Sequence, residues 1–215
     1  MGFGDEMDQH QKEMQTNGSF FKFKKDGDYK FRIMAEPVKK VSRFGYGICY
    51  EGAPYCQKDA LDKEWEEKKA KAVADGKDPS KVARPNVTVK WMTWAYHYAT
   101  ESFLIFEMAN TVATAVLEFM RSDEYGFKEW PMPYDIMIKV KNAGIKEVEY
   151  TVLPARQNTP VSDALMEEYG KLTPIAQIKE RLQAKQKEKV ENGGQSKSGG
   201  IDYPEDDINA EDIPF

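Results

Sequence analysis

Cysteines and long apolar runs are scarce in this chain of 215 residues. It has two cysteines, Cys49 and Cys56, which are too few for a disulfide framework, and no signal peptide precedes them. No apolar run approaches the roughly 20 residues that a membrane-spanning helix needs. We therefore expect a soluble protein of the cytoplasm with no membrane partner, in a reducing setting that leaves both thiols free.

The net charge of −5 is unevenly distributed along the chain. Residues 201–215 hold six acids and no base, so the remaining 200 residues carry a net charge of +1. Within that body, residues 22–43 are rich in lysine and arginine. Partner choice follows local fields more than the total charge, so the acidic total does not exclude a nucleic-acid partner.

The chain ends in an acidic run with an apolar tip, Asp212-Ile213-Pro214-Phe215, preceded by Glu211. This tip resembles the C-terminal end of bacterial and phage single-stranded-DNA-binding proteins, which reads Asp-Asp-Ile-Pro-Phe or a close variant. Here Glu211 stands where an Asp is usual, which keeps the charge. A plain solubilising tail is the alternative, but such a tail has no use for an exposed aromatic residue.

The body also resembles tailed-phage single-stranded-DNA-binding proteins, through a hairpin near 20–34 and a strand–helix–hairpin order across 102–153. The resemblance implies an OB-fold and, for a phage-encoded chain, the host cytoplasm. It further implies a tail that recruits replication, recombination or repair proteins through Asp212, Ile213, Pro214 and Phe215. When no DNA is bound, that tail is expected to lie on the DNA site.

The sequence divides into four parts. A flexible N-terminal segment (1–18) precedes a mainly β, OB-type barrel (19–156) with a helical insertion at about 57–83. Two C-terminal helices (157–190) follow, and then a flexible linker with a disordered acidic tail (191–215). Composition alone also permits other small barrels or an α+β sandwich, and the resemblance favours the OB-type barrel. The helices could pack on the barrel or on a second subunit, which leaves a homodimer open.

Residues 20–34 are predicted to form a hairpin around Asp26-Gly27-Asp28. If Phe23 sits opposite Phe31, the apolar residues share one face. The other face then pairs Lys22 with Arg32 and Lys24 with Lys30. Because like charges directly opposed are unfavourable, this face favours a bound anion, with a solvated sheet face as the alternative.

Residues 87–98 are predicted to form the richest strand. Val87, Val89, Trp91, Thr93, Ala95 and His97 share one parity, which we assign to the core. The other parity presents Lys90, Trp94, Tyr96 and Tyr98 as a stacking surface. A single aromatic residue is more often part of a core, but three aromatic residues that share one face with Lys90 favour a ligand surface, with Trp94 as the best candidate.

These features predict sequence-independent binding of single-stranded DNA, which needs a basic groove and aromatic faces for stacking. We expect a coat that protects single strands in replication, recombination and repair, with no catalytic residue and no cofactor. The expected basic set is Lys22, Lys24, Lys30, Arg32, Lys39, Lys40, Arg43 and Lys90. The expected stacking set is Phe44, Tyr46, Trp94, Tyr96 and Tyr98.

Other functions remain open at this point. A strand-annealing or recombination protein would use the same surface, and a pure recruitment adaptor would need the tail alone. A metal-dependent nuclease needs converging acids, but Glu147 and Glu149 are expected to face Lys141 and Lys139 across a hairpin. A zinc site could use Cys49, Cys56 and His97, although the cysteine spacing is wrong for the usual knuckle.

Overall fold

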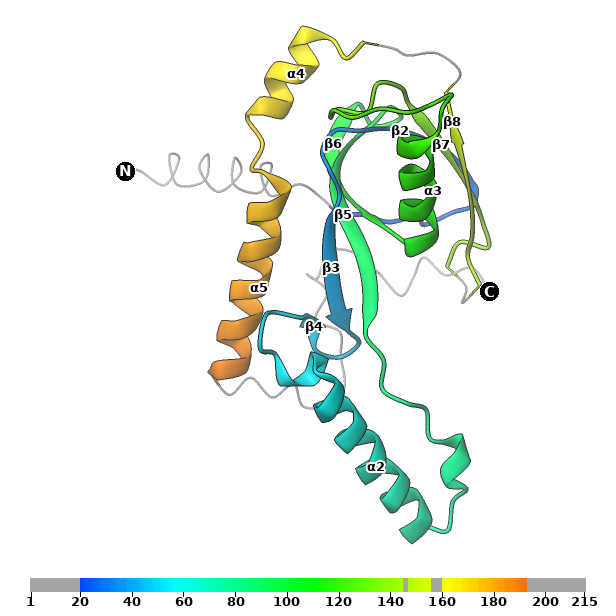
Figure 1. The fold of residues 1–215 in the computed structure, drawn as a ribbon, viewed down its shortest axis with the longest axis vertical. Coiled ribbons are helices and arrows are strands. Elements are labelled where there is room, and N and C mark those ends of the chain that lie inside the picture. Colours follow the sequence, from blue (N-terminus) through cyan, green and yellow to red (C-terminus); the bar gives the residue numbers. More distant parts are fainter. Residues whose placement is uncertain (1–19, 145–146, 156–159, 193–215) are drawn as a thin grey trace, which may run out of the picture.

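The computed structural model describes residues 20–144, 147–155 and 160–192 (Figure 1). The expected N-terminal segment and the acidic tail, including Asp212, Ile213, Pro214 and Phe215, lie outside these residues. The strands are β1 (Phe20–Phe21), β2 (Gly27–Ile33), β3 (Val38–Arg43), β4 (Gly47–Ile48), β5 (Thr88–His97), β6 (Ser102–Met108), β7 (Ile136–Lys141) and β8 (Glu149–Pro154). The helices are η1 (Pro54–Cys56), α2 (Lys58–Ala74), η2 (Pro79–Lys81), α3 (Asn110–Arg121), α4 (Asp163–Gly170) and α5 (Ile175–Glu191).

The strands form one mixed sheet in the order β1-β6-β5-β2-β7-β8. β3 continues along the β5 edge beyond β2 and also pairs with β4. β1 runs parallel to β6, and the other pairs are antiparallel. The mainly β class is therefore confirmed. The expected OB-type barrel is not confirmed, because the described strands form a sheet that is not closed: β1 and β8 do not pair with each other.

One core lies between the sheet and α3. Alternation along β2 and β7 sends Phe31, Ile33, Ile136 and Ile138 to this side, where they are fully buried. Val112 and Val116 of α3, spaced four residues apart, cover them as the helical period requires. The inward parity that we expected for β5 is confirmed at Ala95 and His97.

The predicted hairpin at 20–34 is wrong. β1 pairs with β6, with Phe20 opposite Ile105, and β2 pairs with β5 and β7. Phe21 and Phe23 still pack against Phe31, with ring centroids 5.1 and 6.3 Å away. The two phenylalanine rings are thus buried by packing against Phe31, although their segment does not pair with β2. The expected cross-strand pairs Lys22–Arg32 and Lys24–Lys30 do not form.

The second hairpin, β7–β8, forms with the expected faces in a different register. Val140 lies opposite Tyr150, and Lys141 lies opposite Glu149. Lys139 lies opposite Thr151 and has its Nζ 3.9 Å from Asp28. The expected pairing of Lys139 with Glu149 is therefore wrong by two residues, a slip that keeps every side chain on its own face.

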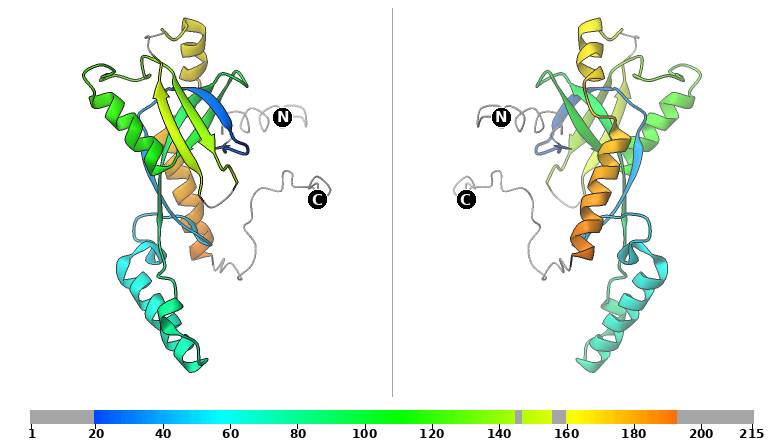
Figure 2. Two further views of the ribbon diagram at one scale, coloured as in Figure 1. Left: turned by 90° about the vertical axis from the view of Figure 1, so that its right-hand side faces the viewer. Right: turned by 90° about the vertical axis from the view of Figure 1, so that its left-hand side faces the viewer.

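A second core lies on the opposite side of the sheet, under α5. Figures 1 and 2 show α3 and α5 on opposite sides. Ile175 and Ile178 of α5 pack with Met92, Trp94 and Ile105. The C-terminal helices thus pack on the sheet of their own chain. No helix in the described ranges is long and apolar enough to cross a bilayer.

The insertion between β4 and β5 projects from the body as the longest protrusion in Figure 1. The predicted helix forms as α2, and η2 leads into the return segment. At its base Cys49 and Cys56 are joined in a disulfide, with Cα atoms 6.1 Å apart. This corrects the expectation of two free thiols, because the turn at η1 brings the two residues together.

Candidate nucleic-acid interface

Trp94 is part of the second core and is not a stacking platform. Its side chain is only 1% exposed, and its indole Nε1 donates a hydrogen bond to the carbonyl of Thr173, 2.8 Å away. Alternation placed Trp94 correctly on the face opposite Ala95. That face is covered by the segment that leads into α5. The prediction that Trp94 stacks on DNA bases is therefore wrong.

Three more expected site residues gather around Asp135 at the β2–β7 end of the sheet. Arg32 Nε donates to the Asp135 carboxylate at 2.6 Å, and Lys30 Nζ lies 3.0 Å from it. The Tyr98 hydroxyl donates to the same carboxylate at 2.7 Å, and Lys30 Nζ lies 4.2 Å from the Tyr98 ring centroid. Arg32 is buried, so it serves this network rather than a surface groove.

The protonation of this network is fixed at neutral pH. Burial raises the pKa of Asp135, but hydrogen bonds from Tyr98, Lys30 and Arg32 outweigh it and hold that pKa below its ordinary value. Burial, together with the hydrogen bond to Asp135, raises the pKa of Tyr98 to about 12. The cluster is therefore a charged carboxylate with two cations and a neutral phenol, an arrangement that stabilises the fold.

Tyr96 lies beside this cluster and is half-buried. Its ring packs edge-on against Tyr98 and Phe103, with centroids 5.2 and 5.3 Å away. Phe103 in turn lies against Tyr169 of α4, at 5.9 Å. The structure thus brings Tyr96 and Tyr98 together as expected, but within a packed aromatic group.

Lys40 and Lys90 lie directly opposite each other on β3 and β5. Both reach Glu107 of β6; Lys40 forms an ion pair with it, and Lys90 Nζ lies 3.4 Å from it. Lys40 also lies over the ring of Phe20, 5.3 Å from its centroid. One carboxylate between two lysines leaves this patch with a net positive charge.

The turn between β3 and β4 carries the most exposed aromatic side chain of the described chain. Phe44 is 83% exposed, and Tyr46 is 45% exposed. Tyr46 stacks on Tyr55, with centroids 4.9 Å apart and planes at 17°, and Arg43 lies 4.8 Å from the Tyr46 ring centroid. An aromatic ring left this open in a well-packed protein is available for stacking.

The turn is held from two sides. Gly45 and Gly47 both have positive φ, at +83° and +78°, which a residue with a Cβ adopts only at a cost. Arg43 pairs with Glu64 of α2, and Gln186 of α5 donates to the carbonyl of Tyr46. The backbone of the turn is thus held between α2 and α5, while the Phe44 ring is exposed to solvent.

We define the β3 strip as five residues along one strand and its turn: Lys39, Lys40, Arg43, Phe44 and Tyr46. Lys39 is exposed and makes no ion pair with any described residue. Lys22 and Lys24 are also exposed, but they lie outside the described strands. Of the thirteen residues expected from the sequence, the five of the β3 strip follow one another along one strand and its turn. Lys40 shares a sheet face with Lys90, whereas Lys39 lies opposite Trp91 on the other face. Arg43 is buried and paired with Glu64, so it orients the turn, and the exposed members are Lys39, Phe44 and Tyr46.

α5 lies beside the β3 strip, a neighbour that was not predicted from the sequence. Gln183 donates to the carbonyl of Cys49 at 2.9 Å, and Gln186 contacts the turn, so α5 runs beside β3 and β4. The helix carries five bases and three acids, a positive balance that its composition already showed. Its bases are Lys179, Arg181, Lys185, Lys187 and Lys189.

The three residues proposed as zinc ligands, Cys49, Cys56 and His97, do not lie together. His97 is buried against Phe31, with ring centroids 5.0 Å apart, and burial lowers its pKa, so the imidazole is neutral at pH 7. It lies in the core, whereas Cys49 and Cys56 lie in a separate cluster. Across residues 20–144, 147–155 and 160–192, no group of three or more His, Cys, Asp or Glu residues could hold a metal ion.

No protein-family model, curated protein or solved structure matches this chain.

Proposed function

We propose that the protein binds single-stranded DNA without reading its sequence, and that the β3 strip is the central contact. The observation that carries the proposal is Phe44, an 83% exposed ring between Arg43 and Tyr46 at the end of a lysine-bearing strand. Stacking of one base on an aromatic ring contributes about 1–3 kcal/mol and tolerates any base. Lys39 and Lys40 supply the cations that a phosphate backbone requires.

The strand order supports an OB-type architecture for this proposal. If β2 and β3 are taken as one interrupted strand, the sheet reads β6-β5-β2/β3-β7-β8, with α3 between β6 and β7. A five-stranded, partly open barrel with this plan is the OB-fold, whose strands and loops bind oligonucleotides. We include the coating role in replication, recombination and repair in the proposal, and assign the chain no catalytic activity.

The direct test is a titration of fluorescently labelled oligo-dT with the full chain, followed by anisotropy. The proposal expects binding that weakens steeply with salt, similar affinity for oligo-dT and oligo-dC, and weaker binding to duplex of the same length. Addition of Mg²⁺ should leave the oligonucleotide uncut. Absence of binding at low salt would overturn the proposal, and cleavage would favour the nuclease alternative.

The acidic tail enters the proposal as a competitor and a recruiting segment. Its six acids are tethered to a body of net charge +1, so a high local concentration favours contact with the basic strip. Deletion of residues 202–215 should tighten oligo-dT binding at low salt, with the difference shrinking at high salt. Anisotropy with both chains measures this, and unchanged affinity at every salt concentration would contradict the competition.

A further inference from the structure

The insertion from Lys58 to Arg84, which we call the α2 arm, adds little to the packed body. Of the 17 residues of α2, only Ala72 is buried. The helix projects away from the sheet in all three ribbon views (Figures 1 and 2). A protrusion of this size that buries so little apolar surface is better explained by a contact than by core stability.

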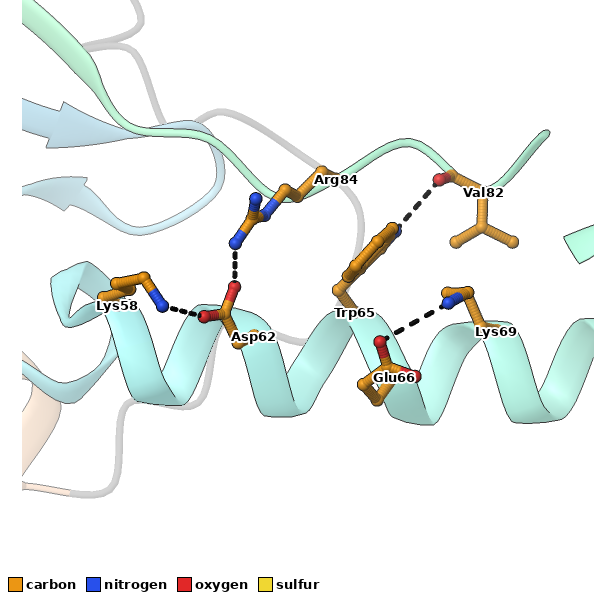
Figure 3. A network of polar contacts seen from close by, with 7 residues as sticks. All are labelled: Lys58, Asp62, Trp65, Glu66, Lys69, Val82 and Arg84. Atoms are coloured by element: carbon orange, nitrogen blue, oxygen red, sulfur yellow. Dashed lines mark hydrogen bonds and ion pairs between the residues drawn. The ribbon is translucent and has the colours of Figure 1, made fainter. Parts of the chain in front are cut away.

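The arm is braced near the body (Figure 3). Asp62 binds Lys58 at 2.6 Å and also pairs with Arg84 of the return segment. The Trp65 indole Nε1 donates to the carbonyl of Val82 at 3.1 Å, and Lys69 Nζ lies 4.3 Å from the Trp65 ring centroid. The return segment is therefore tied to the half of the helix near the body, at Asp62 and at Trp65.

Charge is separated along the arm. Residues 58–67, near the body, hold two lysines and five acids, a net charge of −3. Residues 68–81, which form the far half, hold five bases and two acids, a net charge of +3, while Arg84 lies back at the root beside Asp62. An acidic root and a basic far half create a directed field that would draw an anion toward the far end.

Four of the five acids at the root lie within 4.0 Å of a lysine, and two of these lysines, Lys68 and Lys69, belong to the far half. Glu64 pairs with Lys68, whose Nζ lies 2.8 Å away, and with Arg43; the hydrogen bond from Lys68 and then that from Arg43 lower the pKa of Glu64. At the far half, Lys71 and Lys81 are exposed and pair with no described residue. Lys77 is exposed as well, but its Nζ lies 3.2 Å from the carboxylate of Asp75. The far half therefore presents two cations that the arm itself does not neutralise and a third that is paired at the surface.

We infer that the far half of the α2 arm, through Lys71, Lys77 and Lys81, is a second contact for the same single strand of DNA. The inference rests on the proposed function and extends it. A 17-residue helix is about 25 Å long, so the arm adds several nucleotides to the footprint. The root of the arm is joined to the β3 strip through the Arg43–Glu64 pair. One DNA strand can therefore contact the β3 strip and the far half of the arm together.

A nucleic acid fits this surface better than a protein partner does. Protein interfaces have an apolar core, and aromatic residues are enriched there. Among the far-half residues only Val73 is an exposed large hydrophobic side chain, and Trp65 is held within the arm. Phosphates need cations alone, which is what the far half offers.

The test compares a short and a long oligo-dT, of about 8 and about 30 nucleotides, within and beyond the span of one OB-type site. The triple variant Lys71→Ala, Lys77→Ala, Lys81→Ala should bind the long oligonucleotide more weakly and the short one as the parent does. The slope of log K against log salt should fall by up to about 2 on the long oligonucleotide, near 0.7 for each phosphate that the variant no longer binds.

The matched control removes three exposed lysines elsewhere: Lys128→Ala, Lys141→Ala, Lys171→Ala. The control should keep the parent's affinity and salt slope on both lengths. Equally weakened binding in both variants, equally weakened binding on both lengths, or unchanged binding of the long oligonucleotide would each overturn the arm contact. A parent chain that binds neither length would overturn the proposed function itself, which the other outcomes leave standing.

Discussion

At the scale of single residues, the buried charges of Arg32 and Asp135 stabilise the fold and do not form part of the proposed DNA contact. Arg32 is only 1% exposed, yet its guanidinium is satisfied by Asp135 and by the carbonyl of Met132, 3.3 Å away. A buried cation keeps its place only when such partners are present, because an unpaired one costs several kcal/mol. Asp135 is thus the residue on which this end of the sheet depends.

Replacing Asp135 by Asn should lower the free energy of unfolding by about 3–5 kcal/mol at pH 7, because Arg32 is left buried without a counter-charge. The folded-state pKa of Asp135 lies below its unfolded value. Its ionic stabilisation is therefore complete above about pH 4, the unfolded carboxyl range, and is lost as pH falls through the folded pKa.

Urea unfolding of both chains from pH 7 down to pH 3 measures this effect. The gap between parent and D135N should stay constant at neutral pH and narrow in the acidic range. Exposed Asp123 offers a control, since Asp123→Asn should leave the free energy of unfolding within about 0.5 kcal/mol of the parent. A gap that widens on acidification would contradict the assignment.

The sequence predicts which face of the sheet each β5 side chain lies on, but it does not predict which element covers that face. The alternation of β5 placed Ala95 and Trp94 on opposite faces, and both placements are correct. What buries Trp94 is a segment near Thr173, 79 residues away along the chain. Period-two alternation contains no information about which distant element covers a face, so an aromatic–basic face could not be told from a second core.

At the scale of elements, the α3 helix and the two strands of the β7–β8 hairpin were predictable because their signals are local, but the register of the hairpin was wrong by two residues. The prediction of a hairpin at 20–34 was wrong because Phe21 and Phe23 can bury their rings against Phe31 without their segment pairing with β2. α5 packs beside the β3–β4 turn through Gln183 and Gln186, two polar residues with no periodic signal, and its Val190 packs against the neighbouring cluster of Cys49, Ala53 and Tyr55.

The contact of α5 with the turn can be tested with two glycines of similar positive φ, Gly45 and Gly47. Gly45→Ala should cost about 1 kcal/mol of stability for its positive φ alone, since nothing lies near its Cβ position. Gly47→Ala should cost more, because its Cβ would lie 3.1 Å from the Gln186 side-chain oxygen. Thermal unfolding of both variants measures the difference.

The excess cost at Gly47 should disappear when Gln186→Ala is added. Removing the Gln186 side chain from the parent alone also removes its hydrogen bond to the Tyr46 carbonyl, so the comparison is made within the Gln186→Ala background. Equal costs for Gly45→Ala and Gly47→Ala in the parent would show that α5 does not pack on the turn.

At the scale of the whole molecule, the cations fall on connected surfaces. The β3 strip runs between the α2 arm, through Arg43–Glu64, and α5, through Gln186. An overall charge of −5 hides this arrangement, because six of the acids lie in the last 15 residues. The molecule is best described as a sheet with one exposed aromatic turn and basic elements on both sides of it.

The measurement that tests this account most directly compares Phe44→Ala with Trp94→Leu in oligo-dT binding, each checked for folding by circular dichroism. Phe44→Ala should weaken binding about 5- to 150-fold, equivalent to the stacking of one base, while the protein stays as stable as the parent. Trp94→Leu should reduce stability, because Trp94 is buried, but leave the affinity of the folded protein unchanged. The reverse result, with Trp94→Leu weakening binding and Phe44→Ala binding normally, would contradict the account.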